Sequence, residues 1–335
     1  MFSYLLRRLL YAPLIIVGVM LMTFVLFFVV QSPEVAARNV LGKRATPKTI
    51  ADWLHKRGYD KPLFLNTGGP NTGASTGTFD TIFFNQMRSL ATFDLGVSDV
   101  TGRELKDVFR EGAIPSLLLT LPAYIAGFFM AVGFALYLVF VRKSVLDAAG
   151  VFVCVGLMSI PPMVYIIFGQ AVVALAFNYF PAFGYAKPLL LEPGTWSNLR
   201  YLLLPVAIMI ILHLGSETRL YRAVFLEEIS QDYVRTAQAK GVTNARLLLV
   251  HVLKNGMIAL ITYVVAQLPL LILGSLLVEN FFGIPGLGNT LVLAIQSSDL
   301  AVVRSTTFLT SILYIVGLTL TDICYALVDP RIRLS

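Results

Sequence analysis

Residues Ala113–Val141 read AIPSLLLTLPAYIAGFFMAVGFALYLVFV, a run that contains no charged side chain. A helix needs about 20 consecutive apolar residues to cross the hydrocarbon core of a bilayer, so this run predicts a membrane-spanning helix. The composition agrees, because 57% of the 335 residues are hydrophobic and only 13% are charged. Soluble domains carry about 25% charged residues. The sequence therefore indicates an integral membrane protein. It excludes a disulfide scaffold, since the only cysteines, Cys154 and Cys324, both lie within apolar runs.

Five further apolar runs have the composition of a membrane span: Leu9–Val30, Ala148–Ala186, Tyr201–Ser216, Gly256–Val278 and Ser305–Val328. We therefore predict an all-α membrane protein with six transmembrane helices, which places both chain termini on the same side of the membrane. The first run could also be read as a signal peptide, because two arginines precede it. Its apolar core is longer than the roughly 7–15 residues of a signal peptide, which favours a retained first span.

The positive residues predict the orientation, because cytoplasmic loops are enriched in Lys and Arg. If both termini are cytoplasmic, the inside segments hold 12 of the 26 Lys and Arg residues, and the two short outside loops hold only Lys187, Arg200 and Arg304. The other 11 lie in residues 31–112, a segment long enough to translocate largely regardless of its charge. We expect both termini in the cytoplasm, at a bacterial inner membrane. We expect the basic residues behind the net charge of +7 to interact with lipid headgroups, and we do not expect nucleic acid as a partner.

The external segment between the first two spans, residues 32–112, is expected to form a cap without a large core of its own. Ala45–Lys61 reads as a short helix, with Thr46 as its N-cap, proline at its first position and Gly58 at its end. Asn66–Thr78 is rich in Gly, Thr and Asn and reads as a loop. Phe79–Leu90 is expected to be helical again.

Proline interrupts four of the predicted spans, at Pro115 and Pro122, Pro161 and Pro162, Pro205, and Pro269. A proline inside a membrane helix removes a backbone hydrogen bond and bends the helix. The bends are explained either by packing geometry alone or by helices that surround a central cavity and open it alternately on two sides.

The loop between the fourth and fifth spans has the signals of a short capped helix over 231–240. Ser230 is the expected N-cap, Gly241 is the expected left-handed residue after the helix, and Thr243 is expected to cap the next helix. A helix of about ten residues is marginal alone in water, so other parts of the protein or a partner must stabilise it. The small side chains of Ala237 and Ala239 leave a surface that a partner can approach closely.

The sequence of this loop resembles the signature loop of ABC importer permeases. The residues that carry the resemblance are Asp232-Tyr-Val-Arg-Thr-Ala-Gln-Ala-Lys-Gly241, followed by His251-Val-Leu-Lys-Asn255. The loop resembles most the oligopeptide/dipeptide/nickel permease family. The general loop pattern is E-A-A, three residues, G, nine residues, I-x-L-P. The chain departs from that pattern at Arg235, His251 and Lys254, and these departures look like variants of the peptide branch.

The resemblance extends over nearly the whole chain. Its further landmarks are Tyr4-Leu-Leu-Arg-Arg-Leu9, Tyr59-Asp-Lys-Pro-Leu63, Phe93-Asp-Leu-Gly-Val-Ser98, Phe281-Phe-Gly-Ile-Pro-Gly-Leu-Gly288 and Val328-Asp-Pro-Arg-Ile-Arg333. The loop at 66–78 has no counterpart in the familiar pattern, and no function is transferred to it.

The resemblance implies that the helix at 231–240 is a coupling helix, which lies in a groove of a cytoplasmic ATPase and passes its closure to the spans. The residues expected to touch the ATPase or to set the end of the helix are Arg235, Thr236, Ala237, Ala239 and Gly241. The implied partners are a second homologous permease, two ATPase subunits or domains and an external substrate-binding protein. The chain then divides into a tail and first span (1–31), the external segment (32–112) and a permease core (113–335) with the coupling loop 218–255.

Few catalytic or cofactor motifs argue against the interpretation as a permease. The sequence has no G-x-x-x-x-G-K-[ST], so ATP is expected to be bound by the partners and no cofactor is expected on this chain. His213 and Glu217 share a helix face, but a third metal ligand is missing and no metal site is predicted. Glu279 and Asp322 are costly if they face lipid. Each has either a buried structural partner or a place on the substrate path.

Other functions stay open at this stage. A stand-alone secondary transporter is one alternative, although the middles of the spans are nearly uncharged and no internal repeat is visible. A membrane enzyme is another, and no catalytic constellation supports it. Within the resembled family, nickel chelates, other small solutes and peptides are all compatible with the sequence, with peptides preferred.

Overall fold

The computed structural model describes residues 2–30, 32–42, 44–64, 79–176, 180–185 and 195–328, with the backbone alone for 2–10, 12, 195–198 and 325–328. The described residues form helices and connecting turns, with a single isolated bridge between Val97 and Glu104. The all-α fold is confirmed. The helices, in chain order, are α1 (Phe2–Phe24), η1 (Val25–Val30), α2 (Pro33–Leu41), α3 (Pro47–Arg57), α4 (Ile82–Ala91), α5 (Leu105–Phe140), α6 (Val145–Ser159), α7 (Pro162–Phe168), η2 (Gly169–Ala176), α8 (Thr195–Ile229), α9 (Asp232–Ala239), α10 (Asn244–Arg246), η3 (Leu247–Val252), α11 (Leu253–Gln267), η4 (Leu268–Leu273), α12 (Leu276–Phe282), α13 (Leu287–Gln296) and α14 (Leu300–Val328).

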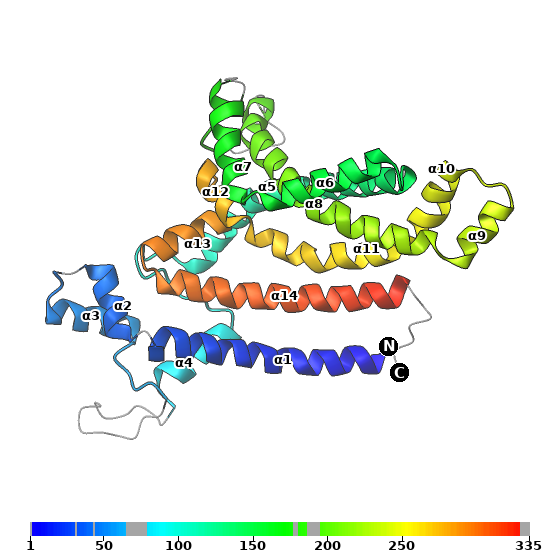
Figure 1. Cartoon of the computed structure of the whole chain (residues 1–335). Helices are drawn as coiled ribbons and strands as arrows, with labels where there is room; N and C mark the ends of the chain where they lie inside the picture. The colour runs from blue at the N-terminus through cyan, green and yellow to red at the C-terminus, as the bar shows by residue number, and fades with distance from the viewer. Residues whose placement is uncertain are drawn as a thin grey trace. The chain divides into compact units, whose positions relative to one another are not determined.

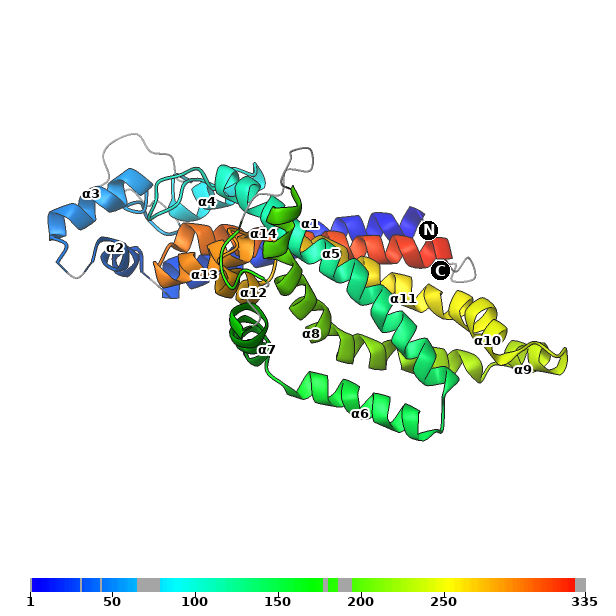
Figure 2. The same cartoon turned by 90° about the horizontal axis from the view of Figure 1, so that it is seen from above.

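Five helical stretches of the described residues are long and apolar enough to cross a membrane: Pro13–Val30, Leu105–Phe140, Leu199–Ile229, Asn244–Phe282 and Leu300–Cys324. A sixth exists if the bent pair Val145–Ser159 and Pro162–Leu175 is one span. The two halves of that pair meet at 90°, and Figure 2 shows the sharp turn between α6 and α7. Of the prolines noted in the sequence, those in α5 and α8 stand within continuous helices. Among the described apolar helices, the one sharp break lies at the Pro161–Pro162 pair.

Residues 1–112 and 290–315 form one compact unit. Its interior consists of small clusters, such as Met20 of α1 with Leu90 of α4 and Phe308 of α14. The helix predicted at 45–61 is present as α3, with Thr46 as its N-cap and Gly58 in the left-handed conformation. Sequence reasoning missed α2, although it begins with the same signals, a serine cap followed by proline. The loop predicted at 66–78 and the landmark beyond Val328 lie outside the described residues.

Residues 113–289 and 316–335 form the second compact unit. Its core has two clusters, one around Tyr221 and Phe225 of α8 and one around Leu119 and Ile166. The helices α6 and α8 lie side by side in Figure 1, and Asp147 and Arg222 join them through an ion pair of 2.7 Å. The candidate sites described below, except for one polar network, all belong to this unit.

Candidate functional site

The helix α9 lies in the loop between α8 and α11, where the sequence predicted it, and is yellow in Figure 1. Its N-cap differs from the prediction. Gln231 has the extended backbone of a cap but gives no side-chain cap bond, and the expectation for Ser230 was wrong. The Ser230 hydroxyl instead donates to the Glu227 carbonyl oxygen, 2.7 Å away, because Ser230 still belongs to the turn that ends α8.

The end of α9 follows the prediction. Gly241 has a φ of +79°, a conformation that costs a residue with a Cβ about 1–2 kcal/mol. The Gly241 amide donates to the Gln238 carbonyl at 2.9 Å, and the Val242 amide donates to the Ala237 carbonyl at 3.3 Å. A Cβ on Gly241 would meet nothing within 4 Å. Glycine is therefore favoured here by the backbone conformation and not by lack of space.

One face of α9 attaches the helix to the rest of its unit. Val234 and Ala237, three residues apart, have exposed fractions of 1% and 8% and belong to the core cluster of Tyr221 and Phe225. The Tyr233 hydroxyl also donates to the Glu228 carboxylate at 2.6 Å. These contacts explain how so short a helix is stable.

The other face of α9 is exposed. The Arg235 side chain is 75% accessible and lies 3.5 Å from Asp232. Thr236, Ala239 and Gly241 are exposed as well. Four of the five residues predicted from the family resemblance therefore lie on a free surface, and Ala237 instead faces inward and anchors the helix.

Glu279 lies at the end of the Asn244–Phe282 stretch with an exposed fraction of 0%. Its carboxylate accepts hydrogen bonds from the Ser116 hydroxyl at 2.8 Å, the Ser275 amide at 3.1 Å and the Asn289 amide at 3.0 Å. The Ser116 oxygen in turn accepts from the Leu287 amide at 2.8 Å. The carboxylate thus ties α5 to both ends of the 274–289 segment.

Glycines make room for this carboxylate. A Cβ on Gly274 or Gly286 would overlap the Glu279 carboxylate, and a Cβ on Gly288 would come within 2.9 Å of it. Two of these glycines belong to the glycine-rich landmark at 281–288. The structure therefore gives that landmark a physical reason, which is the close approach of its backbone to a buried acid.

Asp322, the other candidate for a substrate path, lies in α14 and is partly buried. Neither Asp322 nor Glu279 is among the residues that line the cavity described next.

A cavity of about 270 Å³ opens among α5, α8 and α11. Its lining is formed by Thr120, Ala123, Tyr124, Gly127, Met209, His213, Glu217, Tyr263, Gln267, Leu270, Leu271, Gly274 and Ser275. The sequence showed that His213 and Glu217 share one face of a helix. It could not show that residues of α5 and α11 complete an enclosure around them, because those residues are distant in the chain. No group of three or more possible metal ligands occurs among the described residues.

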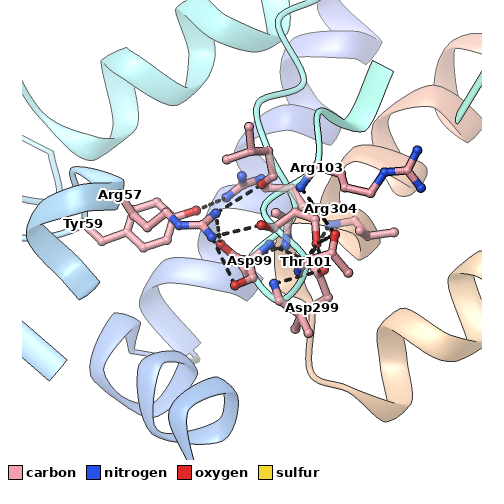
Figure 3. Close-up of polar contacts among 12 residues, drawn as sticks. Arg57, Tyr59, Asp99, Thr101, Arg103, Asp299 and Arg304 are labelled. Carbon is pink, nitrogen blue, oxygen red and sulfur yellow. Dashed lines mark hydrogen bonds and ion pairs between the residues drawn. The ribbon is translucent and has the colours of Figure 1, made fainter. Parts of the chain in front are cut away.

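A separate polar network lies in the unit of residues 1–112 and 290–315 (Figure 3). The Arg57 guanidinium at the end of α3 donates to the Asp99 carboxylate at 2.8 Å and to the Ser98 carbonyl at 2.9 Å. The Asp99 carboxylate accepts from the Ala301 amide in the first turn of α14, and Asp299 accepts from the Asp99 amide. Burial raises the pKa of Asp99, and the charges of Arg57 and a second arginine oppose that rise. The network joins α3 to the start of α14.

Comparison with known proteins identifies the family. A family model described as the binding-protein-dependent transport system inner membrane component matches residues 109–334. The chain belongs to this family. A second family model, described as the N-terminal part of the membrane component of binding-protein-dependent transport systems, matches residues 1–67 of this inner membrane component.

The inner membrane component is similar along its whole length to bacterial permeases. It is 28% identical over 336 residues to the dipeptide transport system permease protein DppB of Bacillus subtilis, covering 100% of the chain and 99% of the relative. It is 26% identical over 334 residues to the oligopeptide transport system permease protein AppB of the same organism, with coverage of 99% and 100%. It is 27% identical over 337 residues to the glutathione transport system permease protein GsiC of Shigella flexneri, with coverage of 99% for both chains.

Family and fold agree on the location of the chain. An inner membrane component of a binding-protein-dependent transport system with five or six membrane-crossing helices is a multi-pass inner-membrane protein. The resemblance found in the sequence to the peptide branch of ABC importer permeases is confirmed by the family and by the names of these relatives.

Proposed function

We propose that this chain is the transmembrane permease subunit of an ATP-driven ABC importer that carries peptides or peptide-like solutes across the cytoplasmic membrane by alternating access. The family supports the role of permease. The names of three relatives that match over the full chain, which transport dipeptides, oligopeptides and glutathione, support the class of substrate.

The permease is expected to work in an assembly. It pairs with a second homologous permease. Two ATPase subunits or domains bind the pair on the cytoplasmic side, and an external binding protein delivers the substrate. Both chain termini and the 218–255 loop face the cytoplasm, as the distribution of Lys and Arg favours. The 32–112 segment then faces the binding protein.

The single observation that carries the proposal is the two-sided nature of α9. Its inner face is packed into the core that α8 and η3 share, and its outer face presents Arg235, Thr236 and Ala239. A helix held this way moves as one body with the two long helices that flank it in sequence. We infer that an ATPase groove receives the outer face. ATP-driven closure of the ATPases displaces α9, the displacement turns the cavity outward, and hydrolysis resets it.

The test is ATP hydrolysis by the full complex in liposomes, stimulated by the loaded binding protein. Gly241→Val forces a β-branched residue into the left-handed conformation, and we expect it to lower stimulated hydrolysis severalfold. Gly241→Asn should retain most of it, because asparagine tolerates that conformation. Gly156→Ala is the matched control, since a Cβ on Gly156 meets nothing within 4 Å and its φ is not positive.

Equal stimulated hydrolysis in the valine and asparagine variants would contradict the role of α9. Purification of the tagged chain without any co-purifying P-loop ATPase, together with substrate uptake that needs no ATP, would favour a stand-alone secondary transporter instead.

A further inference from the structure

The cavity among α5, α8 and α11 contains a buried acid that the fold does not otherwise use. Glu217 has an exposed fraction of 7% and forms none of the ion pairs found among the described residues. Its neighbour Tyr221, one turn further along α8, hydrogen-bonds the carboxylate. An acid within a membrane-crossing helix that lies against a cavity is by default a functional group, because its burial costs free energy without a structural return.

Glu279 shows what a structural acid looks like in the same unit. It is enclosed by a hydroxyl and by backbone amides, and it does not line this cavity. Glu217 has one phenol as its hydrogen-bond partner and an open space in front of it. The contrast separates an acid that holds the fold from an acid that is left available.

The lining is chemically one-sided. His213 and Tyr263 are exposed, Gln267 is partly buried, and all three line the cavity. No hydrogen bond of the described residues uses the side chains of these three, so their oxygen and nitrogen atoms are available to a ligand. The lining contains no Lys or Arg. The acid and these hydrogen-bonding groups therefore match the cationic, hydrogen-bond-donating group of a ligand.

Three other polar side chains in the lining already have hydrogen-bond partners, and one of them, the Ser275 hydroxyl, accepts from the Val278 amide at 3.4 Å. The Tyr124 hydroxyl donates to the Val264 carbonyl at 2.8 Å, and the Thr120 hydroxyl donates to the Leu271 carbonyl at 2.8 Å. They hold α5 against α11 and η4 and fix the shape of the cavity. The remaining wall is apolar, which raises the strength of any interaction with Glu217 by excluding water.

The size of the cavity fits a small peptide. Met209, His213 and Glu217 line it along α8, and the eight steps of 1.5 Å from the first to the last make this stripe about 12 Å long. An extended dipeptide spans about 7 Å. The volume of about 270 Å³ is just below the ~300–1,000 Å³ of typical ligand sites, as expected for a small ligand.

We propose that this cavity is a binding site on the substrate path, in which Glu217 receives the primary ammonium group of the peptide and His213, Tyr263 and Gln267 hydrogen-bond around it. The inference rests on the proposed function, since it assigns a residue to the peptide that the importer carries. It gives the permease a selectivity of its own, for substrates with a free amino terminus.

The experiment is ATP-dependent uptake by the full complex in liposomes, with alanyl-alanine and N-acetyl-alanyl-alanine supplied at concentrations that load the binding protein equally. We expect the wild-type complex to prefer the free amine by about tenfold, as a charge-assisted hydrogen bond implies. Glu217→Gln should bring this preference close to one. Glu104→Gln, the same substitution at an exposed glutamate outside the cavity, should leave the preference unchanged. N-acetyl-alanyl-lysine separates the α-amino group from a side-chain amine.

The preference is a ratio measured on one complex, so a lower yield of the variant does not change it. If the Glu217→Gln complex fails to assemble, a Tyr263→Cys variant without the two native cysteines decides the question. Alanyl-alanine should protect its thiol from a water-soluble reagent, and the acetylated peptide should not.

Equal protection, or an unchanged preference in Glu217→Gln, would overturn the site. If the wild-type complex takes up both peptides equally, the site fails and the importer stands. No ATP-dependent uptake of any peptide would instead contradict the proposed function.

Discussion

At the scale of single residues, we expect the two buried glutamates of the permease to give different phenotypes when they are changed to glutamine. Glu217→Gln should change the substrate preference, and Glu279→Gln should lower the stability. Glu279 accepts hydrogen bonds from one hydroxyl and two backbone amides, and glycines lie against it. An amide at this position keeps the shape of the side chain but turns an N–H group toward donors. We expect Glu279→Gln to destabilise the protein by about 2–4 kcal/mol, because it leaves buried donors without a partner.

The measurement is the thermal midpoint of the detergent-solubilised complex, with the exposed Glu104→Gln as the control. If Glu279 belonged to the substrate path, the variant would keep the wild-type midpoint and change the KM for peptide instead. That result would favour the other interpretation that the sequence left open, in which Glu279 lies on the substrate path.

A second residue-scale contrast concerns the arginines of the 32–112 segment. Arg57 lies against Asp99, whose side chain is 3% exposed, whereas Arg103 pairs with Glu111 and both of those side chains are more than half exposed. We expect Arg57→Gln to cost about 3 kcal/mol, because it leaves a buried carboxylate without its partner. Arg103→Gln should cost less than about 1 kcal/mol.

The Arg57 variant should also depend on pH. Burial raises the pKa of Asp99 above its unfolded value, so the stability that this group contributes is present at low pH and is lost as the pH rises through the folded pKa. Removing Arg57 removes a charge that holds this pKa down. The deficit of Arg57→Gln should therefore be larger at pH 8 than at pH 5, as followed by thermal unfolding. An equal deficit at both values would show that Asp99 does not titrate in this range.

At the scale of elements, the bend between α6 and α7 has two separable causes. The residue before a proline avoids the helical conformation, and Ile160 is extended, with φ −88° and ψ 126°. The Tyr165 hydroxyl also donates to the Leu157 carbonyl across the break at 2.9 Å. The prolines therefore open the helix, and the phenol fixes the angle.

Removing both causes should straighten this pair. Spin labels at the exposed positions 146 and 167 lie about 23 Å apart along two perpendicular helices and about 32 Å apart along one straight helix, at 1.5 Å per residue. We expect the triple variant Pro161→Ala, Pro162→Ala, Tyr165→Phe to move the distance distribution toward the longer value, measured by pulsed electron spin resonance. Pro205→Ala, within the continuous α8, is the control and should leave the distance unchanged. An unmoved distribution in the triple variant would assign the bend to packing against neighbouring helices.

Elements also show what a sequence can and cannot predict. Local signals were sufficient for α3, where a threonine cap, a proline and a terminal glycine stand within one short stretch. The same kind of signal placed the end of α9 correctly and its start one residue too early, because the turn at Ser230 belongs to the helix before it. The cavity around Glu217 was not predictable, since its walls come from three helices whose contacts depend on tertiary packing.

At the scale of the whole molecule, the uneven distribution of positive charge makes the topology testable. The inside segments carry 12 Lys and Arg residues against three in the short outside loops. Single cysteines at Thr243, in the loop after α9, and at Thr101, in the 32–112 segment, should report opposite sides of the membrane. Both positions are exposed.

The background for this test replaces the native cysteines. Cys154 is fully buried in α6 and Cys324 is partly buried in α14, so alanine is tolerated at both with a modest loss of packing. In intact cells, a membrane-impermeant maleimide should label position 101 and spare position 243, and it should label both after the cells are opened. Labelling of position 243 alone in intact cells would show that the chain has the opposite orientation in the membrane. The outer face of α9 would then be out of reach of any cytoplasmic ATPase, and the ATP-driven mechanism would fail with it, because coupling requires that face and the motor to lie on the same side.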